Sequence, residues 1–217
     1  MNAIKLPSHE ATYRQLRDMV LFGALAPGQP VTIQGLTSEL GAGMTPVREA
    51  IRRLTAEGAL EFLGNRRVCV PRLSPSQVDE LAFAKLAIEP HLGALALAAL
   101  SDADIDAIAA IDAALDRAIA GGDVQGYLRH NYRFHFALYD HAGAAILTAI
   151  ARSLWLRFGP SMRAVCAGAG TGSLPDRHRD AVAAMRARDR AGLEAALADD
   201  IGQGITLVRQ AMAVGEI

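Results

Sequence analysis

Apolar residues between positions 43 and 54 recur with the period of an α-helix. Their spacing of i, i+3, i+4 and i+7 places them on one face, which a helix can bury against the rest of the protein. This apolar stripe consists of Val47, Ala50, Ile51 and Leu54. The pattern therefore predicts an amphipathic helix over residues 43–54.

The start of this predicted helix is small and polar, and its outer face is basic. Thr45 suits the N-cap position, and Pro46 then falls at the first helical position, where its missing N–H loses no hydrogen bond. Arg48 and Arg52 lie opposite the apolar stripe. Such a helix suits reading of the DNA major groove. The pattern alone fits a plain surface helix equally well.

The segment before this helix favours the DNA-binding interpretation. Residues 32–40 predict a helix of about two turns that is closed by Gly41. A short helix, a tight turn and a second helix form a helix-turn-helix. Further upstream, Ser8 can cap a helix over residues 9–23, and residues 26–30 form a turn.

A β-hairpin with a basic tip is predicted after the helix. Residues 59–63 and 67–71 are short β-prone runs on either side of a turn, so they predict a wing. Arg66 and Arg67 stand at its tip, where they can reach phosphates or the minor groove. Residues 1–72 therefore predict a winged helix-turn-helix domain.

The rest of the chain has helical periodicity and almost no strand signal. Ser74 and Pro75 suit the N-cap and first position of a helix. We expect helices over 75–100, 102–120, 124–142, 144–167, 175–187 and 190–214, bends at Pro90 and Pro160, and a flexible loop at 168–172. The fold class is therefore mainly α, with an all-α helical bundle over residues 73–217 behind the winged domain.

Charge and composition agree with this division. The chain has 217 residues and 51% apolar content, which is enough for two modest folded domains. Residues 1–72 carry nine Lys/Arg against six Asp/Glu, and residues 73–217 carry thirteen against seventeen. A basic N-terminal part and an acidic C-terminal part suit a DNA-binding domain joined to a domain that need not contact DNA.

The sequence gives no sign of export or of a membrane span. Cys69 and Cys166 show no paired or metal-ligand spacing, which is typical of buried thiols in a reducing compartment. The first residues lack the apolar core of a signal peptide, and no apolar run reaches the roughly 20 residues that cross a bilayer. We expect a cytoplasmic protein without membrane contact.

Polar side chains at inward positions of the predicted bundle indicate a candidate metal site. Asn131 and His135 are four residues apart, so they project from the same buried face of a helix. His178 and Asp200 have apolar neighbours at helical spacing on two later helices. Four such groups would suit Zn²⁺ or another first-row divalent ion. Histidines that are simply hydrogen-bonded in the core are the alternative.

The run Thr45-Pro46-Val47-Arg48-Glu49-Ala50-Ile51 is the most specific motif of the chain. It is accompanied by residues 13–20, Gly23, Pro27-Gly28, Leu54, Glu57-Gly58 and Asn65-Arg66. With these pieces, residues 10–71 resemble the winged helix-turn-helix domain of the GntR family of bacterial transcription regulators. Two positions depart from the family pattern: Met44 replaces a usual arginine, and Arg67 replaces a usual glycine of the wing.

The bundle half carries motifs of its own. They are Lys85-Leu86-Ala87-Ile88-Glu89, Asn131-Tyr132-Arg133-Phe134-His135, and Arg177-His178 with Asp189 and Asp200 downstream. With them, residues 74–214 resemble the FCD effector domain of the FadR-like branch of the same family. This resemblance implies Asn131, His135 and His178 as metal ligands, and Asp200 stands where a third histidine usually lies. The implied ion is Zn²⁺, with Ni²⁺ or Mn²⁺ as alternatives.

Proteins similar to this one hold a small carboxylate effector beside the metal. The arginine that usually assists on the first bundle helix is Lys85 here, which keeps the charge but not the bidentate geometry. Arg157 or Arg163 could compensate for that exchange, but a solvated charge is the favoured interpretation of both arginines. The resemblance therefore implies an organic-acid effector with Lys85 as one of its contacts.

The sequence predicts a ligand-responsive transcription regulator, most often a repressor in this family, and not an enzyme. It would bind a palindromic operator as a homodimer, and the effector would shift the balance between dimer geometries. The residues expected to contact DNA are Thr45, Arg48, Arg52, Arg66 and Arg67.

Three alternatives remain at this stage. The metal itself could be the signal, or the site could belong to a metal-dependent hydrolase. The sequence places no obvious general base beside the ligands, and catalysis would leave the winged domain unexplained. A DNA-packaging protein is the third alternative, and the acidic bundle argues against it.

Overall fold

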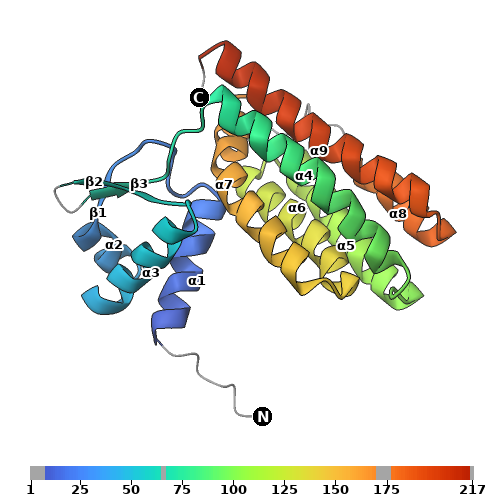
Figure 1. Cartoon of the computed structure of the whole chain (residues 1–217), viewed down its shortest axis with the longest axis horizontal. Helices are drawn as coiled ribbons and strands as arrows, with labels where there is room; N and C mark the ends of the chain where they lie inside the picture. Colours follow the sequence, from blue (N-terminus) through green and yellow to red (C-terminus); the bar gives the residue numbers. More distant parts are fainter. Residues whose placement is uncertain (1–7, 65–66, 170–176, 216–217) are drawn as a thin grey trace.

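The structure, a computed structural model, describes residues 8–64, 67–169 and 177–215. Figure 1 shows a small part with helices and strands on one side and an elongated bundle of helices beside it. Arg66, part of the predicted loop 168–172 and the predicted helix start at Pro175 lie outside the described residues.

The N-terminal part contains a helix-turn-helix and a small sheet. Its elements are α1 (Ser8–Leu21), β1 (Val31–Thr32), α2 (Ile33–Glu39), α3 (Met44–Ala56), β2 (Glu61–Gly64) and β3 (Arg67–Cys69). Strands β2 and β3 pair antiparallel as the predicted wing, and β1 adds to the other edge of β3. The sequence pattern missed β1 because two residues are too few to show an alternation.

Helix α3 buries the predicted stripe but begins earlier than expected. The helix begins at Met44 with Gly43 as its N-cap, so the assignment of Thr45 as the N-cap is wrong. The first helical hydrogen bond runs from Val47 N–H to the Gly43 carbonyl, at 3.3 Å. Pro46 lies directly before that donor, and every earlier N–H in the turn lacks a helical acceptor. Proline is therefore tolerated at every position of this turn. For this reason Pro46 does not identify the residue at which the helix begins.

Local chemistry sets both ends of α2, of which the sequence predicts only the closure at Gly41. Thr32 caps α2, since its side-chain oxygen accepts a hydrogen bond from Gly35 N–H at 2.9 Å. Gly41 has φ +58°, a left-handed conformation that glycine adopts without steric strain. This residue ends α2 and turns the chain towards α3.

The C-terminal part is helical within the described residues. Its elements are α4 (Pro75–Leu97), α5 (Asp102–Ala120), α6 (Val124–Tyr139), the 3₁₀ turn η1 (Asp140–Ala142), α7 (Ala145–Ala169), α8 (His178–Ala187) and α9 (Arg190–Ala213). Ser74 forms the predicted cap of α4, reinforced by Gln77 in a capping box. Pro90 and Pro160 both lie inside helices. None of the described helices is long and apolar enough to cross a membrane.

Helix α1 packs directly against α7 of the bundle. A Cβ atom added to Gly159 of α7 would lie 2.7 Å from the Leu21 carbonyl oxygen, so the two backbones are in close contact. Arg157 of the same helix donates a hydrogen bond from Nε to the Glu57 carbonyl at 3.0 Å. The two parts of the chain therefore meet through backbone contacts as well as through side chains.

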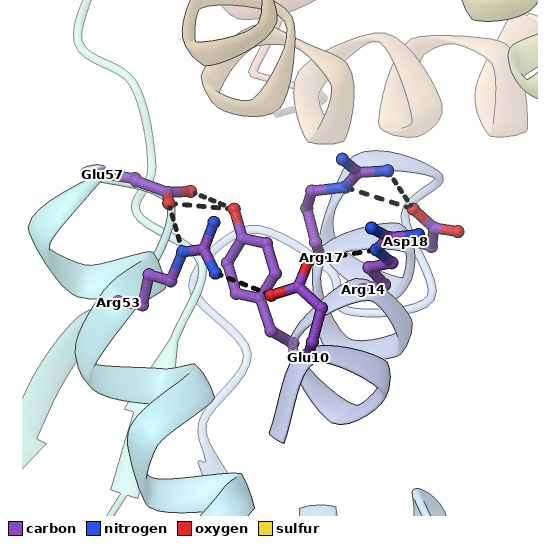
Figure 2. A network of polar contacts seen from close by, with 7 residues as sticks. Glu10, Arg14, Arg17, Asp18, Arg53 and Glu57 are labelled. Atoms are coloured by element: carbon purple, nitrogen blue, oxygen red, sulfur yellow. Dashed lines mark hydrogen bonds and ion pairs between the residues drawn. The ribbon is translucent and has the colours of Figure 1, made fainter. Parts of the chain in front are cut away.

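Figure 2 shows the ion-pair network between α1 and α3. Arg53 of α3 reaches Glu10 at 3.1 Å and Glu57 at 3.4 Å. Its guanidinium also lies 3.6 Å from the ring centroid of Tyr13, whose hydroxyl donates to the Glu57 carboxylate. Arg53 is thus committed to holding α3 on α1, in contrast to Arg48 and Arg52 on the outer face.

Candidate functional site

His135 lies on α6 and is enclosed by the bundle, with 1% of its side chain exposed. Its Nδ1 atom is 3.0 Å from the Tyr139 hydroxyl, which donates to Glu89 Oε2 at 3.0 Å. Because the single hydroxyl proton of Tyr139 is donated to Glu89, the Tyr139 oxygen accepts a hydrogen bond from the N–H at His135 Nδ1. This network fixes the tautomer of His135, with its proton on Nδ1 and a lone pair on Nε2.

His178 begins α8 and is held by two contacts. Its ring stacks on Phe134 with centroids 3.9 Å apart and an angle of 17° between the planes. Its Nδ1 atom lies 3.1 Å from Oδ1 of the buried Asp112 of α5. A carboxylate can only accept a hydrogen bond, so Nδ1 carries the proton and Nε2 again presents a lone pair.

Asp200 of α9 faces both Nε2 atoms. Its Oδ2 is 3.1 Å from His135 Nε2, and its Oδ1 is 3.7 Å from His178 Nε2. One ligand atom from each of the three residues falls within 4.8 Å of the others. Helices α6, α8 and α9 thus bring together three of the four residues predicted as metal ligands.

Burial and charge set the protonation of this cluster. Burial lowers the pKa of His135 by more than the Asp200 carboxylate raises it, so the ring stays neutral near pH 7. Burial by itself raises the pKa of Asp200, but His178 and His135 outweigh it and hold that pKa below its usual range. The cluster therefore places an ionised carboxylate beside the neutral ring of His135.

The donor set fits a divalent metal ion. His135 Nε2 is buried, and although Asp200 lies close, the geometry is not that of a hydrogen bond. Two imidazole nitrogens and a carboxylate oxygen are ligands that Zn²⁺ and other first-row ions accept. Asp112 and Tyr139 contact the Nδ1 atoms of the two rings, as outer partners of metal-binding histidines do.

Asn131 and Lys85 reach the same region from a neighbouring cavity. Both line this cavity together with Asp200, and its walls come from α4, α6, α7 and α9. Leu21 and Phe22, at the end of α1, also line it. The cavity therefore opens between the bundle and the winged part of the chain.

The amino group of Lys85 is already paired. Lys85 and Glu89 are both buried, and Nζ lies 2.5 Å from Glu89 Oε1 and 4.2 Å from the ring centroid of Trp155. Glu89 also accepts hydrogen bonds from Tyr139 and, at 2.8 Å, from Trp155 Nε1. Neither Arg157 nor Arg163 lines the cavity, so the structure does not bring either arginine to the place where it could compensate for Lys85.

Sequence reasoning missed the outer partners Glu89, Asp112 and Tyr139. Two of them carry a local signal, since Tyr139 follows His135 and Glu89 follows Lys85 by four residues, which is one helical turn. Asp112 stands among the aliphatic positions of α5, an unusual place for a carboxylate. Its partner His178 is 66 residues away, and no local pattern connects the two.

Most residues predicted to contact DNA lie on the surface of the winged part. Thr45, Arg48, Arg52 and Arg67 are exposed, and Arg66 lies outside the described residues. Arg52 pairs with Glu49 at 2.8 Å, whereas Arg48 forms no ion pair with any residue that the structure describes. Arg48 is therefore the arginine of α3 whose charge is most available to a partner.

Comparison with known proteins connects both parts of the chain to one kind of protein. The family model of gntR-family bacterial regulatory proteins matches residues 8–70, and the FCD domain model matches residues 80–203. The HTH-type transcriptional regulator McbR of Escherichia coli K12 is 28% identical over 198 residues, covering 90% of each chain. The HTH-type transcriptional repressor GlaR of the same organism is 27% identical over 216 residues, covering 93% of this chain and 96% of GlaR.

Solved structures agree with this relationship. The structure of E. coli McbR/YncC has a TM-score of 0.91 at 26% identity, covering 96% of this chain and all of that one. A GntR regulator from Rhodococcus sp. RHA1 shares the fold with a TM-score of 0.76 at 18% identity, covering 94% and 98%. These relatives are transcription regulators and not enzymes. The chain therefore belongs to the GntR family of bacterial transcription regulators, with an FCD domain behind its helix-turn-helix.

Proposed function

We propose that this regulator binds a palindromic operator as a homodimer and acts as a repressor. In this proposal residues 1–72 bind DNA, and residues 73–217 dimerise and bind a small carboxylate beside a divalent ion. Zn²⁺ is the favoured ion, with Ni²⁺ or Mn²⁺ as alternatives. Binding of the carboxylate changes the affinity for the operator.

The convergence of His135, His178 and Asp200 carries the metal part of the proposal. Their ligand atoms lie within 4.8 Å of one another, and both rings are oriented by outer partners. Asn131, on the wall of the adjoining cavity, would add an amide oxygen. When bound, the ion would supply a positive centre for a carboxylate oxygen.

The position of the cavity supports a direct connection between effector and DNA. Leu21 and Phe22 line it; Leu21 ends the helix that packs against the recognition helix α3, and Phe22 directly follows it. Gly159, whose α-carbon faces the Leu21 carbonyl, lines it as well. A ligand in this cavity would therefore touch both parts of the chain at once.

The exposed face of α3 supports the proposed operator contacts. We propose that Arg48, Arg52 and Thr45 contact bases or the flanking phosphates. Arg66 and Arg67 of the wing would contact the backbone or the minor groove. Phosphate contacts set the register of the protein on DNA, and base contacts set the sequence preference.

Exposed apolar side chains on two adjacent helices support a homodimer. Phe83 and Leu86 on α4, and Ile146 and Ile150 on α7, are exposed, with Phe83 and Ile146 each 78% accessible. Large apolar side chains left in water are typical of surfaces that bind another protein chain. Two-fold protein symmetry would then match a two-fold operator.

Selection of operator DNA tests this proposal. Duplexes are selected from a random library with the full-length protein, and affinities are measured by fluorescence anisotropy at one salt concentration. We expect palindromic half-sites bound by two chains. Arg48→Ala should weaken binding about 5- to 150-fold, or about 1–3 kcal/mol, whereas Arg133→Ala on the exposed surface of α6 should not.

Three results would count against parts of the proposal. Unchanged affinity in Arg48→Ala would remove this residue from the DNA-binding surface. Binding of one chain to asymmetric sites would exclude the homodimer. If Zn²⁺ alone changes the affinity and no organic acid adds to that change, the metal itself is the signal.

A further inference from the structure

The cavity beside the candidate metal centre has little positive charge with which to bind an anion. Among the described residues that line it, Lys85 and Asp200 are the charged side chains. Glu89 holds Lys85 at 2.5 Å and is itself held by Tyr139 and Trp155. Turning Lys85 towards a ligand would leave a buried carboxylate without its cation, which is costly.

The neighbouring arginines are committed elsewhere. Arg157 donates to the Glu57 carbonyl at 3.0 Å, and Arg163 packs alongside Gly23, where an added Cβ would overlap its side chain. Arg152 forms an ion pair with Asp140 at 2.6 Å. None of these three arginines lines the cavity.

The proposed metal ion would not leave surplus positive charge. A divalent ion brings two positive charges, and Asp200 and Asp112 already bring two negative charges to the cluster. One carboxylate of a ligand can still bind there because it contacts the ion directly. The attraction between opposite charges is strongest at this shortest distance. A second carboxylate on the same ligand would lie farther out, against the neutral Lys85–Glu89 pair or against apolar walls.

The remainder of the cavity is mainly aromatic and aliphatic, with the amide side chains of Asn131 and Gln203 among its lining residues. Aromatic side chains from the end of α1, from α6 and from α7 line it: Phe22, Tyr127, Tyr132, Trp155 and Phe158. Aliphatic side chains such as Leu21, Met162 and Leu207 complete the walls. Such walls favour a flat, apolar ligand, and aromatic rings add offset or edge-to-face contacts to simple burial.

We propose that the effector is an aromatic acid with one carboxylate and an apolar body. This inference rests on the proposed function, since it assumes a carboxylate effector at the metal centre. The carboxylate lies at the His135, His178 and Asp200 end, and the ring extends between Trp155 and the end of α1. Acids with two or three carboxylates are rejected because the cavity provides no cation for the second one.

Trp155 provides a reporter of binding. It is the single tryptophan of the chain and lines the cavity. The full-length protein loaded with Zn²⁺ is titrated with benzoate, succinate, citrate and the neutral amide benzamide. Fluorescence reports occupancy, and calorimetry gives the dissociation constants. We expect benzoate to bind at least ten-fold more tightly than succinate, citrate or benzamide.

A matched variant tests the role of the buried ion pair. Glu89→Gln keeps the side-chain size and an acceptor oxygen for Tyr139 and Trp155, but it releases the charge of Lys85. We expect the preference for benzoate over succinate to fall at least ten-fold in this variant. Circular dichroism checks the fold of this variant. If Glu89→Gln does not fold, the titrations of the unchanged protein with the four ligands still test the proposal.

The outcomes separate this inference from the proposed function. Tighter binding of succinate or citrate than of benzoate would overturn the monocarboxylate inference and leave the metal-dependent regulator standing. If none of the acids binds the Zn²⁺-loaded protein, the proposed carboxylate effector fails and the inference falls with it. Benzoate binding that survives in His135→Ala would support the ligand class while contradicting the role of the metal.

Discussion

At the scale of single residues, the outer partner of each buried histidine determines its tautomer. His135 and His178 each donate a hydrogen bond from Nδ1 to an outer partner. The lone pairs of both Nε2 atoms therefore face Asp200. The sequence could place these three side chains inside the bundle, because each has apolar neighbours at helical spacing. It could not pair His178 with Asp112, which comes from another helix.

The two cysteines give a pH-dependent test of burial. Burial and a hydrogen bond to Glu61 raise the pKa of Cys69 to about 11, and burial raises the pKa of Cys166 to about 11. An exposed thiol has a pKa of about 8.5, so the unfolded chain loses these protons first. The free energy of unfolding should therefore be highest below pH 8.5 as far as these groups contribute, and it should fall as the pH rises towards 11.

Thiol labelling measures this directly. At pH 8 the folded protein should react with a thiol reagent far more slowly than the denatured protein, in which both cysteines react. The folded-state rate should continue to rise up to about pH 11. A rate that levels off near pH 8.5 would show that the thiols are not buried as described.

At the scale of elements, capping chemistry was predictable and helix starts were less so. Ser74 caps α4 as expected, because the cap and its N–H partner are only three residues apart. Thr32 caps α2 in the same way, although the sequence pattern places it inside the helix. Thr45 was misassigned because the first turn of a helix tolerates proline at several positions. Strand β1 was missed because its two residues pair with β3, which follows 35 residues later.

The two neighbouring arginines of α3 should behave differently when each is replaced by alanine. Arg53 contacts Glu10, Glu57 and the Tyr13 ring, so Arg53→Ala should lower the stability by about 1 kcal/mol and the Tm by about 2–4 °C. Arg52 is exposed and pairs only with its neighbour Glu49 among the described residues. Arg52→Ala should therefore weaken operator binding with little change in Tm.

Thermal unfolding and operator binding are measured on both variants side by side. Equal Tm values for the two variants would show that the network of Figure 2 does not hold α3 on α1. Undiminished operator binding by Arg52→Ala would place that residue outside the DNA contact.

At the scale of the whole molecule, the cavity, the candidate metal centre and α1 form one continuous region. Leu21 lines the cavity, and its carbonyl lies against Gly159 of α7. The sequence predicted both domains and their order, because each has its own periodicity. It could not predict that the end of α1 would line this cavity, because this contact joins residues more than 130 positions apart.

Gly159→Ala tests how tightly the two parts are joined. The added methyl group would lie 2.7 Å from the Leu21 carbonyl, so α1 must move away from α7. We expect a lower Tm and a changed operator affinity. Gly202→Ala on α9 is the control, because no atom lies within 4 Å of its added methyl and alanine favours helices by about 1 kcal/mol over glycine. Equal Tm changes in both variants would show that the contact between α1 and α7 is loose.

The proposed regulator depends on a metal ion that the bundle holds through His135, His178 and Asp200. Elemental analysis of protein purified without chelators tests it most directly, on the unchanged chain and on His135→Ala, His178→Ala and the exposed-site control His91→Ala. We expect one divalent ion per chain, retained in His91→Ala and lost in the two variants of the cluster. A chain that holds no metal, or variants of the cluster that keep it, would rule out this metal centre.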